Sequence, residues 1–261
     1  MRPKGYSELS KDAVYLLSRS EFEKQKVITT AYAVTVLGSY RKATALLAGL
    51  AQRNRLIQLR KGRYLVVPLK APNQRWMPSE FAVASLWMGD VPYYIGYSST
   101  YNYWGFTEQL PQSVCVLNTQ KEWRRKIGKN SYVAIKISPQ KMYGLQKIKI
   151  DDVNVFMSDK ERTLVDFIYN PIGSWENVQK VLSEQINKIN LAKFVRYLMR
   201  FPVVAVQKRA GVMLERAGAP SEYVGKLKDS IGKNNTYVTF NPFMKSRKGK
   251  VDKGWKVIFN G

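Results

Sequence analysis

Residues 39–68 read "SYRKATALLAGLAQRNRLIQLRKGRYLVVP" and contain seven lysines or arginines but no aspartate or glutamate. The bias extends beyond this stretch, since eleven basic residues and no acidic residue occur from Lys24 to Ser79. Like charges repel one another within a folded segment, and an anionic partner offsets that repulsion. The stretch therefore predicts a surface that binds a polyanion.

The first part of the stretch has the spacing of an amphipathic helix. Its larger apolar residues recur at positions i, i+3, i+4 and i+7, the pattern of one buried face: Ala43, Leu46, Leu47 and Leu50. Ser39 is a suitable N-cap, and Gly38 is suited to end a shorter helix in residues 29–38. Two helices around a tight glycine turn form a candidate helix-turn-helix.

The opposite face of the second helix is small and polar. It carries Arg41, Ala45, Ala48 and Gln52, with Lys42, Thr44 and Gly49 at its edges. Such a face lets a helix lie close to the floor of the major groove of DNA. The side chains expected to contact DNA are Arg41, Lys42, Thr44 and Gln52. A solvated face is the alternative for a helix that stands alone.

A predicted hairpin follows the helix. Residues 56–68, "LIQLRKGRYLVVP", alternate apolar side chains on both sides of "RKG", with Gly62 in the turn. A basic hairpin directly after a helix-turn-helix is a wing, and its tip contacts the phosphate backbone. The side chains expected there are Arg60, Lys61 and Arg63. With a first helix in residues 7–19, the region predicts a winged helix-turn-helix that faces DNA.

The expected fold class of the whole chain is α+β, in two domains. Three prolines within residues 68–78 predict a linker. We therefore expect a winged helix-turn-helix DNA-binding domain at residues 1–72 and a larger mixed α/β domain at residues 73–261. Its expected elements are strands within 113–118, 131–138 and 146–158, basic helices in 177–231, and terminal strands in 236–240 and 254–259 that are joined by a basic loop.

The net charge and the cysteine and histidine counts limit which partners the protein could bind and which reactions it could catalyse. The formal net charge of +24 favours nucleic acid over an anionic membrane surface. The polar start lacks the apolar core of a signal peptide, so we expect a cytoplasmic protein that does not bind membranes. One cysteine and no histidine exclude an intrachain disulfide, the usual zinc sites and histidine-dependent nucleophiles. Cys115 lies in an apolar run that favours a buried structural thiol, and we expect no cofactor.

A Mg²⁺-dependent enzyme acting on nucleic acid is one alternative. Its candidate ligands are Asp151, Asp152, Asp159, Glu161 and Asp166. Ser158 and Glu161 have the spacing of a capping box, which already explains acidic residues at a helix start. Asp151 and Asp152 are adjacent, so on a strand they would point to opposite faces. We therefore expect that the protein is not an enzyme and that it has no catalytic residues and no metal site.

An RNA-binding protein is a second alternative, because residues 73–261 contain 29 basic against 15 acidic residues. The candidate stacking side chains are Tyr93, Tyr94, Tyr97, Tyr101, Tyr103 and Trp104, which also fit the edge of an apolar core. Apart from the RNA alternative, a possible second basic surface lies within the basic set from Lys188 to Arg209, as the candidate working surface for a task of the second domain that is separate from DNA binding. Its members Lys193, Arg196 and Arg200 recur on one helical face, for which a solvated surface is the alternative.

Three stretches resemble the AbiEi-type antitoxins and transcriptional regulators of type IV toxin–antitoxin systems. They are the helix-turn-helix with "RNRLIQLRKGRYLVVP", then "YYIGYSSTYNYWGFTEQ", then "MSDKERTLVDFIYNP" with basic helices and a final "GWKVIFN" strand. Together they span nearly the whole chain.

The resemblance implies an N-terminal domain that binds operator DNA and represses its own operon. It also implies a C-terminal domain that counters a nucleotidyltransferase-like toxin, functionally rather than necessarily by contact. It brings no catalytic residues. The residues that match are Arg41, Lys42 and Thr44 on the recognition helix and Arg60, Lys61 and Arg63 on the wing.

Overall fold

The computed structural model describes residues 9–69, 71 and 76–260. Helices and three sheets are both present, so the expected mixed α+β class is confirmed. The chain divides into two compact units, and neither unit is one continuous segment. Unit 1 comprises residues 1–90, 124–132 and 149–154, and unit 2 comprises residues 91–123, 133–148 and 155–261. The predicted boundary near residue 72 lies outside the described residues.

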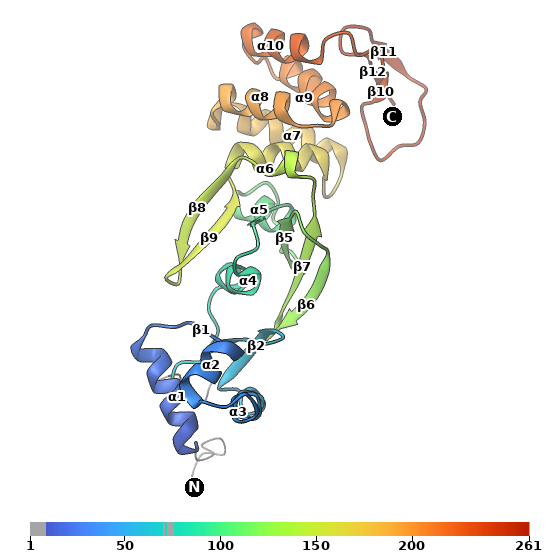
Figure 1. The fold of residues 1–261 in the computed structure, drawn as a ribbon. Helices are drawn as coiled ribbons and strands as arrows, with labels where there is room; N and C mark the ends of the chain where they lie inside the picture. Colours follow the sequence, from blue (N-terminus) through green and yellow to red (C-terminus); the bar gives the residue numbers. More distant parts are fainter. Residues whose placement is uncertain (1–8, 70, 72–75, 261) are drawn as a thin grey trace. The chain divides into compact units, whose positions relative to one another are not determined.

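Unit 1 begins with three helices and three strands (Figure 1). In chain order they are α1 (Lys11–Phe22), β1 (Val27–Thr29), α2 (Thr30–Leu37), α3 (Tyr40–Gln52), β2 (Leu56–Arg60) and β3 (Arg63–Val66). The strands form an antiparallel sheet in the order β1-β3-β2. Strand β1 was not predicted, because three residues are too few to show a period.

The core of this region forms where the apolar faces of the helices meet. Ala43, Leu47 and Leu50 of α3 are buried with Leu16 and Leu17 of α1. Burial of each leucine stabilises the fold by about 1.5–3 kcal/mol. The predicted apolar stripe of α3 is therefore confirmed, with Leu46 only partly buried against the same cluster.

Helix α4 (Glu80–Met88) also belongs to unit 1. Its apolar residues are buried on more than one side, including Phe81, Val83, Trp87 and Met88. Trp87 contacts Tyr132, with ring centroids 5.8 Å apart. A helix that is apolar all round is a core helix rather than a surface helix.

The largest sheet has six strands in the order β6-β7-β5-β4-β9-β8. The elements of this region are β4 (Tyr93–Ile95), α5 (Ser98–Tyr103), β5 (Val114–Asn118), β6 (Trp123–Ile127), β7 (Asn130–Lys136), β8 (Leu145–Ile150) and β9 (Val153–Ser158). Asp151 and Asp152 form the two-residue turn between β8 and β9, with φ of 48° and 58°. The expectation that they lie on a strand is wrong, because aspartate tolerates the left-handed backbone of such turns.

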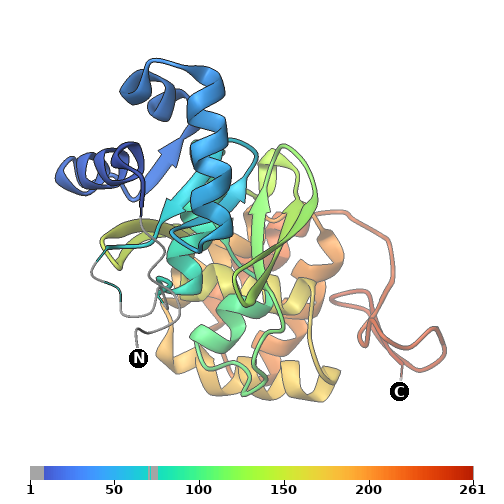
Figure 2. The same cartoon turned by 90° about the horizontal axis from the view of Figure 1, so that it is seen from below.

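The rest of unit 2 is helical until its last strands (Figure 2). The helices are α6 (Lys160–Tyr169), α7 (Trp175–Gln185), α8 (Leu191–Arg200), α9 (Val204–Arg216) and α10 (Ser221–Ile231). A small sheet follows, made of β10 (Val238–Thr239), β11 (Lys250–Asp252) and β12 (Val257–Phe259), in the order β10-β12-β11. The two terminal strands were predicted, whereas β11 falls in the predicted basic loop.

Helix α6 begins one residue later than the predicted capping box implies. Its N-cap is Asp159, whose side chain accepts a hydrogen bond from the backbone N–H of Arg162 at 2.8 Å. Ser158 instead ends β9, and its hydroxyl is hydrogen-bonded to Thr163. Both residue types make good N-caps, so the sequence alone could not choose between them.

Candidate nucleic-acid interface

Helix α3 is positioned by a tight turn and a side-chain cap. Gly38 has a φ of +70°, which lets α2 end and α3 begin two residues later. Ser39 is the N-cap, and its hydroxyl accepts a hydrogen bond from the backbone N–H of Lys42 at 3.4 Å. Both assignments confirm the sequence prediction. The outer face of α3 is exposed at Arg41, Ala45, Ala48 and Gln52.

Two of the four predicted contact residues on α3 already have partners within the fold. Lys42 forms an ion pair with Asp12 of α1 at 2.9 Å, although both side chains are about half exposed. The Thr44 hydroxyl donates to the carbonyl of Tyr40 at 2.9 Å. Within the described residues, the side chains of Arg41 and Gln52 form no hydrogen bond or ion pair. Arg41 is therefore the cation most available on this face.

The β2–β3 turn is held against the start of α2. Gly62 has a φ of +71°, and a Cβ atom there would lie 3.2 Å from the hydroxyl oxygen of Thr30. The backbone N–H of Thr30 donates to the carbonyl of Gly62 at 2.9 Å. A larger residue at 62 would be strained and crowded, so glycine fixes where Lys61 is presented. Lys61 is exposed and Arg60 is half-buried.

Arg63, a predicted DNA contact of the wing, has a partner within the fold. Its Nε donates to the carbonyl of Leu86 at 3.1 Å, in the last turn of α4. Its guanidinium also lies beside Gly89, where a Cβ atom would be only 3.1 Å away. A cation at a helix C-terminus is stabilised by the orphan carbonyls and the helix dipole. The main role of Arg63 in this structure is to cap α4.

An open groove of about 720 Å³ lies between the β2–β3 turn and the two helices. Hydroxyl-bearing and basic side chains line it, together with small apolar ones: Thr30, Ala31, Val34, Thr35, Tyr40, Thr44, Lys61 and Tyr64. Tyr40 is 69% exposed, so its ring lies open at the start of α3. Hydroxyl and lysine side chains are typical donors to phosphate oxygens.

The acidic residues near this surface are confined to α1 and its C-cap. In residues 9–69 they are Asp12, Glu21 and Glu23, and each is used within the fold. Glu23 lies 2.8 Å from the Nε of Arg19, and this hydrogen bond lowers the pKa of Glu23. Positive charge consequently dominates the exposed faces of α3 and the β2–β3 turn, although Asp12 pairs with Lys42 on α3.

Sequence reasoning missed a further set of cations in unit 1. The segment 124–132 includes four of them: Arg124, Arg125, Lys126 and Lys129. Arg125 donates to the side-chain oxygen of Gln58 in β2 at 3.2 Å. Arg124, Lys126 and Lys129 are exposed. The run "RRKIGK" was the available signal, but it lies about sixty residues beyond β3 in the chain.

The possible second basic surface is only partly exposed. Lys193 Nζ lies 3.1 Å from Asp159 Oδ2 and 3.0 Å from Glu161 Oε2. Burial alone would lower the pKa of Lys193, but the two carboxylates outweigh it and raise that pKa. The Arg200 guanidinium lies 4.3 Å from the ring of Tyr143. Lys193 thus joins α6 to α8, while Arg196 and Arg200 are exposed.

The carboxylates considered for an enzyme have partners within the fold, and Asp159 and Glu161 share Lys193. Glu161 accepts from the backbone N–H of Asn190 at 2.9 Å. Asp166 pairs with Arg162 at 3.0 Å, and both side chains are 1% exposed. Burial raises the pKa of Asp166 to about 6, against the opposing effect of Arg162. Within residues 9–69, 71 and 76–260, no three histidine, cysteine, aspartate or glutamate side chains are grouped to hold a metal ion.

The tyrosines considered for RNA stacking are mostly internal. Tyr93, Tyr94, Tyr97 and Tyr101 are buried, so their faces cannot stack on bases. Tyr101 illustrates their role, because its hydroxyl donates to the carbonyl of Asp166 at 2.9 Å and its ring packs on Phe167. Burial also raises the pKa of Cys115, whose Sγ lies 3.3 Å from the hydroxyl of Ser98.

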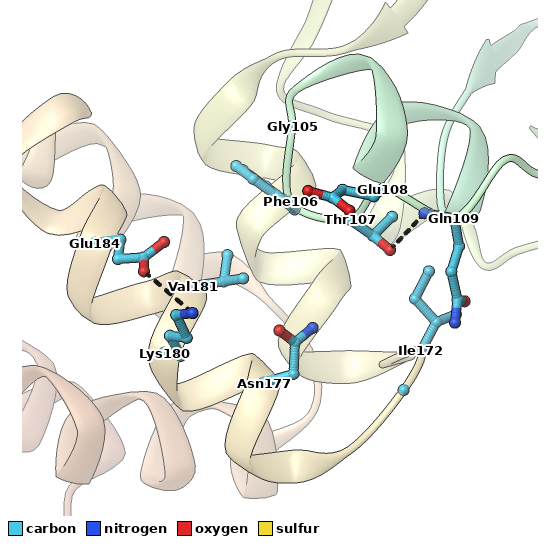
Figure 3. Close-up of a pocket in the computed structure, with 11 residues that line it drawn as sticks. Gly105, Phe106, Thr107, Glu108, Gln109, Ile172, Asn177, Lys180, Val181 and Glu184 are labelled. Atoms are coloured by element: carbon cyan, nitrogen blue, oxygen red, sulfur yellow. Dashed lines mark hydrogen bonds and ion pairs between the residues drawn. The ribbon is translucent and has the colours of Figure 1, made fainter.

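Unit 2 also has a shallow pocket of about 430 Å³ between the loop after α5 and helix α7 (Figure 3). Glu108, Asn177, Lys180 and Glu184 line it, and Lys180 and Glu184 pair across one helical turn at 3.9 Å. None of the candidate DNA, RNA or metal residues lines this pocket.

The part of the chain that the structure describes has no helix long and apolar enough to cross a bilayer. No family model matches the chain, and no curated protein matches its sequence. The fold is similar to the crystal structure of the RV2827C protein from Mycobacterium tuberculosis, with a TM-score of 0.67 and 15% sequence identity. The alignment covers 98% of this chain and 94% of that one, so the likeness extends over the whole fold.

Proposed function

We propose that this chain binds duplex DNA sequence-specifically through a winged helix-turn-helix in unit 1. We also propose that it acts as the autorepressor and antitoxin of a type IV toxin–antitoxin system, with a nucleotidyltransferase-like toxin. It carries out no catalysis in this role. The two parts of the proposal have different support, so they need separate tests.

The observation that carries the DNA-binding part is the exposed, acid-free face of α3 beside a basic turn. Arg41 and Gln52 are exposed on α3, and Lys61 is exposed on the β2–β3 turn. Helix α3 and this turn border one open groove. In winged helices the second helix of the motif enters the major groove, and the hairpin contacts the backbone. The exposed cations of segment 124–132 would add phosphate contacts.

The antitoxin part rests on the resemblance of three sequence stretches to AbiEi-type proteins. The stretch that includes α6 forms a structural centre in unit 2, because Arg162 and Asp166 are buried and Asp159 and Glu161 bind Lys193. This part supplies no catalytic groups to the proposal. Protection from a toxin would come from binding or regulation.

The DNA-binding test uses the full chain and a duplex selected from a random library. Arg41→Ala should weaken binding to the selected duplex by about 1–3 kcal/mol and weaken binding to random duplex less. Arg196→Ala removes the same charge from an exposed position on α8 and should leave both affinities unchanged. Equal losses on both duplexes for Arg41→Ala would contradict base recognition by α3.

The antitoxin test is coexpression with the reading frame adjacent to this gene. If that frame encodes a nucleotidyltransferase-like protein that stops growth, coexpression of this chain should restore growth. Persistent growth arrest, with the chain folded and expressed, would contradict the antitoxin role and leave DNA binding unaffected.

A further inference from the structure

The C-terminal segment Tyr237–Lys256 concentrates cations on unit 2. It contains six lysines or arginines and a single acidic residue, Asp252. Five of the cations are exposed: Lys245, Arg247, Lys248, Lys250 and Lys253. Asp252 is occupied within the fold, since it accepts from the backbone N–H of Trp255 at 2.9 Å. In both ribbon views this segment lies to one side of helices α7–α10 (Figures 1 and 2).

Exposed apolar side chains precede these cations in the same segment. Phe243 is 53% exposed, Met244 is 42% exposed and Tyr237 is 39% exposed. An ordinary solvated lysine-rich loop does not need an aromatic ring facing water. An exposed aromatic ring close in sequence to several cations is instead typical of surfaces on which unpaired bases stack.

The turn that presents Phe243 is held by a buried side chain. Asn260 is 4% exposed, and its Oδ1 accepts from the backbone N–H of Asn241 at 2.9 Å. Its Nδ2 donates to the carbonyls of Asn241 at 3.0 Å and Met244 at 3.1 Å. The Asn241 side chain in turn accepts from the backbone N–H of Phe243 at 3.0 Å. Phe243 is thus held outward by a hydrogen-bonded turn.

The segment is also fixed to the helices of unit 2. The ring of Trp255 packs so closely on α9 that a Cβ atom at Gly211 would lie 2.2 Å from it. The indole N–H of Trp255 donates to Glu215 at 2.9 Å. A fixed platform loses less conformational entropy on binding than a free tail does.

We propose that the segment Tyr237–Lys256 binds single-stranded RNA, with Phe243 stacking on a base and Lys245 and Lys248 contacting phosphates. A duplex hides its base faces, whereas single-stranded RNA loops and ends expose them to aromatic side chains. An acidic protein surface would match the cations but would not need the exposed ring. This activity is additional to the proposed binding of duplex DNA by unit 1, because it uses different residues.

The test measures binding of the full chain to a labelled single-stranded RNA by fluorescence anisotropy over a range of salt concentrations. Phe243→Ala should weaken binding about tenfold, and Phe243→Trp should retain it. The double variant Lys245→Glu/Lys248→Glu should lower the slope of log K against log salt by about 1.4, as expected for two lost phosphate contacts. Duplex DNA binding should change by less than twofold in these variants.

Matched controls separate the segment from general charge and apolar exposure. Lys136→Glu/Lys188→Glu makes the same change in net charge at two exposed lysines of unit 2, and Leu110→Ala removes an exposed apolar side chain. Neither should alter RNA binding. The proposal is overturned if Phe243→Ala leaves RNA affinity unchanged, if the controls weaken it equally, or if poly-glutamate competes as well as RNA. Tighter binding of the matching single-stranded DNA would overturn the assignment to RNA.

Discussion

Lys61 and Arg63 lie two residues apart in one basic turn, yet the structure gives them different tasks. Lys61 is exposed, whereas Arg63 caps the end of α4 through the carbonyl of Leu86 at 3.1 Å. We therefore expect Lys61→Ala to affect DNA binding and Arg63→Ala to affect stability.

The magnitudes follow from these contacts. A hydrogen bond from a charged donor contributes about 1.5–3 kcal/mol, and a cation at a helix C-terminus contributes about 0.3–1 kcal/mol. Because Arg63 is only half-buried, we expect Arg63→Ala to lower the free energy of unfolding by about 2 kcal/mol, near the lower end of the combined range. Lys61→Ala should change it by less than about 0.5 kcal/mol.

Two measurements on each variant distinguish the tasks. Urea denaturation followed by circular dichroism gives stability, and anisotropy with duplex DNA over a salt series gives the number of phosphate contacts. Lys61→Ala should lower the salt slope by about 0.9, the value for one lost phosphate contact. Arg63→Ala should keep the wild-type slope in the folded protein.

Arg63→Lys is the matched control, because it keeps the charge but loses the guanidinium that caps α4. It should be destabilised and should bind DNA with an unchanged slope. The reasoning is refuted if Arg63→Ala keeps wild-type stability while lowering the salt slope, or if Lys61→Ala leaves that slope unchanged.

Three further changes test the fold of unit 2. Burial raises the pKa of Asp166 to about 6 from 3.8, so the folded state binds this proton more tightly and stability from this group grows as pH falls from 7 towards 4. Asp166→Asn should abolish this pH dependence of stability in a series of denaturation experiments, because asparagine does not titrate. Gly211→Ala should lower stability by about 1–3 kcal/mol through its clash with Trp255, seen as a lower Tm. Lys193→Ala should lower the free energy of unfolding, measured by urea denaturation, by about 1–2 kcal/mol. Alanine in place of an exposed arginine of the same helix should not lower it.

Much of the fold near α3 could be predicted because local signals agree there. The apolar period, the Ser39 cap and the Gly38 turn each involve residues close in sequence. Strands β4 and β6 were not predicted, for opposite reasons. Tyr93–Ile95 is buried throughout and shows no alternation, whereas Trp123–Ile127 contains three consecutive basic residues and lacks an apolar period.

The sequence could predict which face of α3 is exposed. It could not predict which of the basic side chains have partners within the fold. Helical geometry alone exposes Arg41 opposite the leucine stripe. The partner of Arg63 is a backbone carbonyl 23 residues away, and a carbonyl has no sequence signature. Lys193 likewise meets Glu161 across 32 residues. Such pairings depend on tertiary packing, so sequence periodicity could not reveal them.

The basic residues therefore fall into two groups, those with partners within the fold and those exposed to solvent. Only the structure shows which residue belongs to which group. Cations held within the fold have specific oxygen or ring partners: Arg63, Arg162, Lys193 and Lys208. Lys208 is 1% exposed, and its Nζ donates to the carbonyl of Thr236 at 2.6 Å, while burial lowers its pKa. Replacing lysine by arginine, or arginine by lysine, at these internally paired positions should destabilise the protein, because the shape and donor geometry of the side chain matter there. At exposed positions such as Lys61 the same exchange keeps the charge that a phosphate attracts, so binding should persist. If Lys/Arg exchange left the free energy of unfolding unchanged at the internally paired positions as well as at the exposed ones, the pairings of these cations would not stabilise the fold.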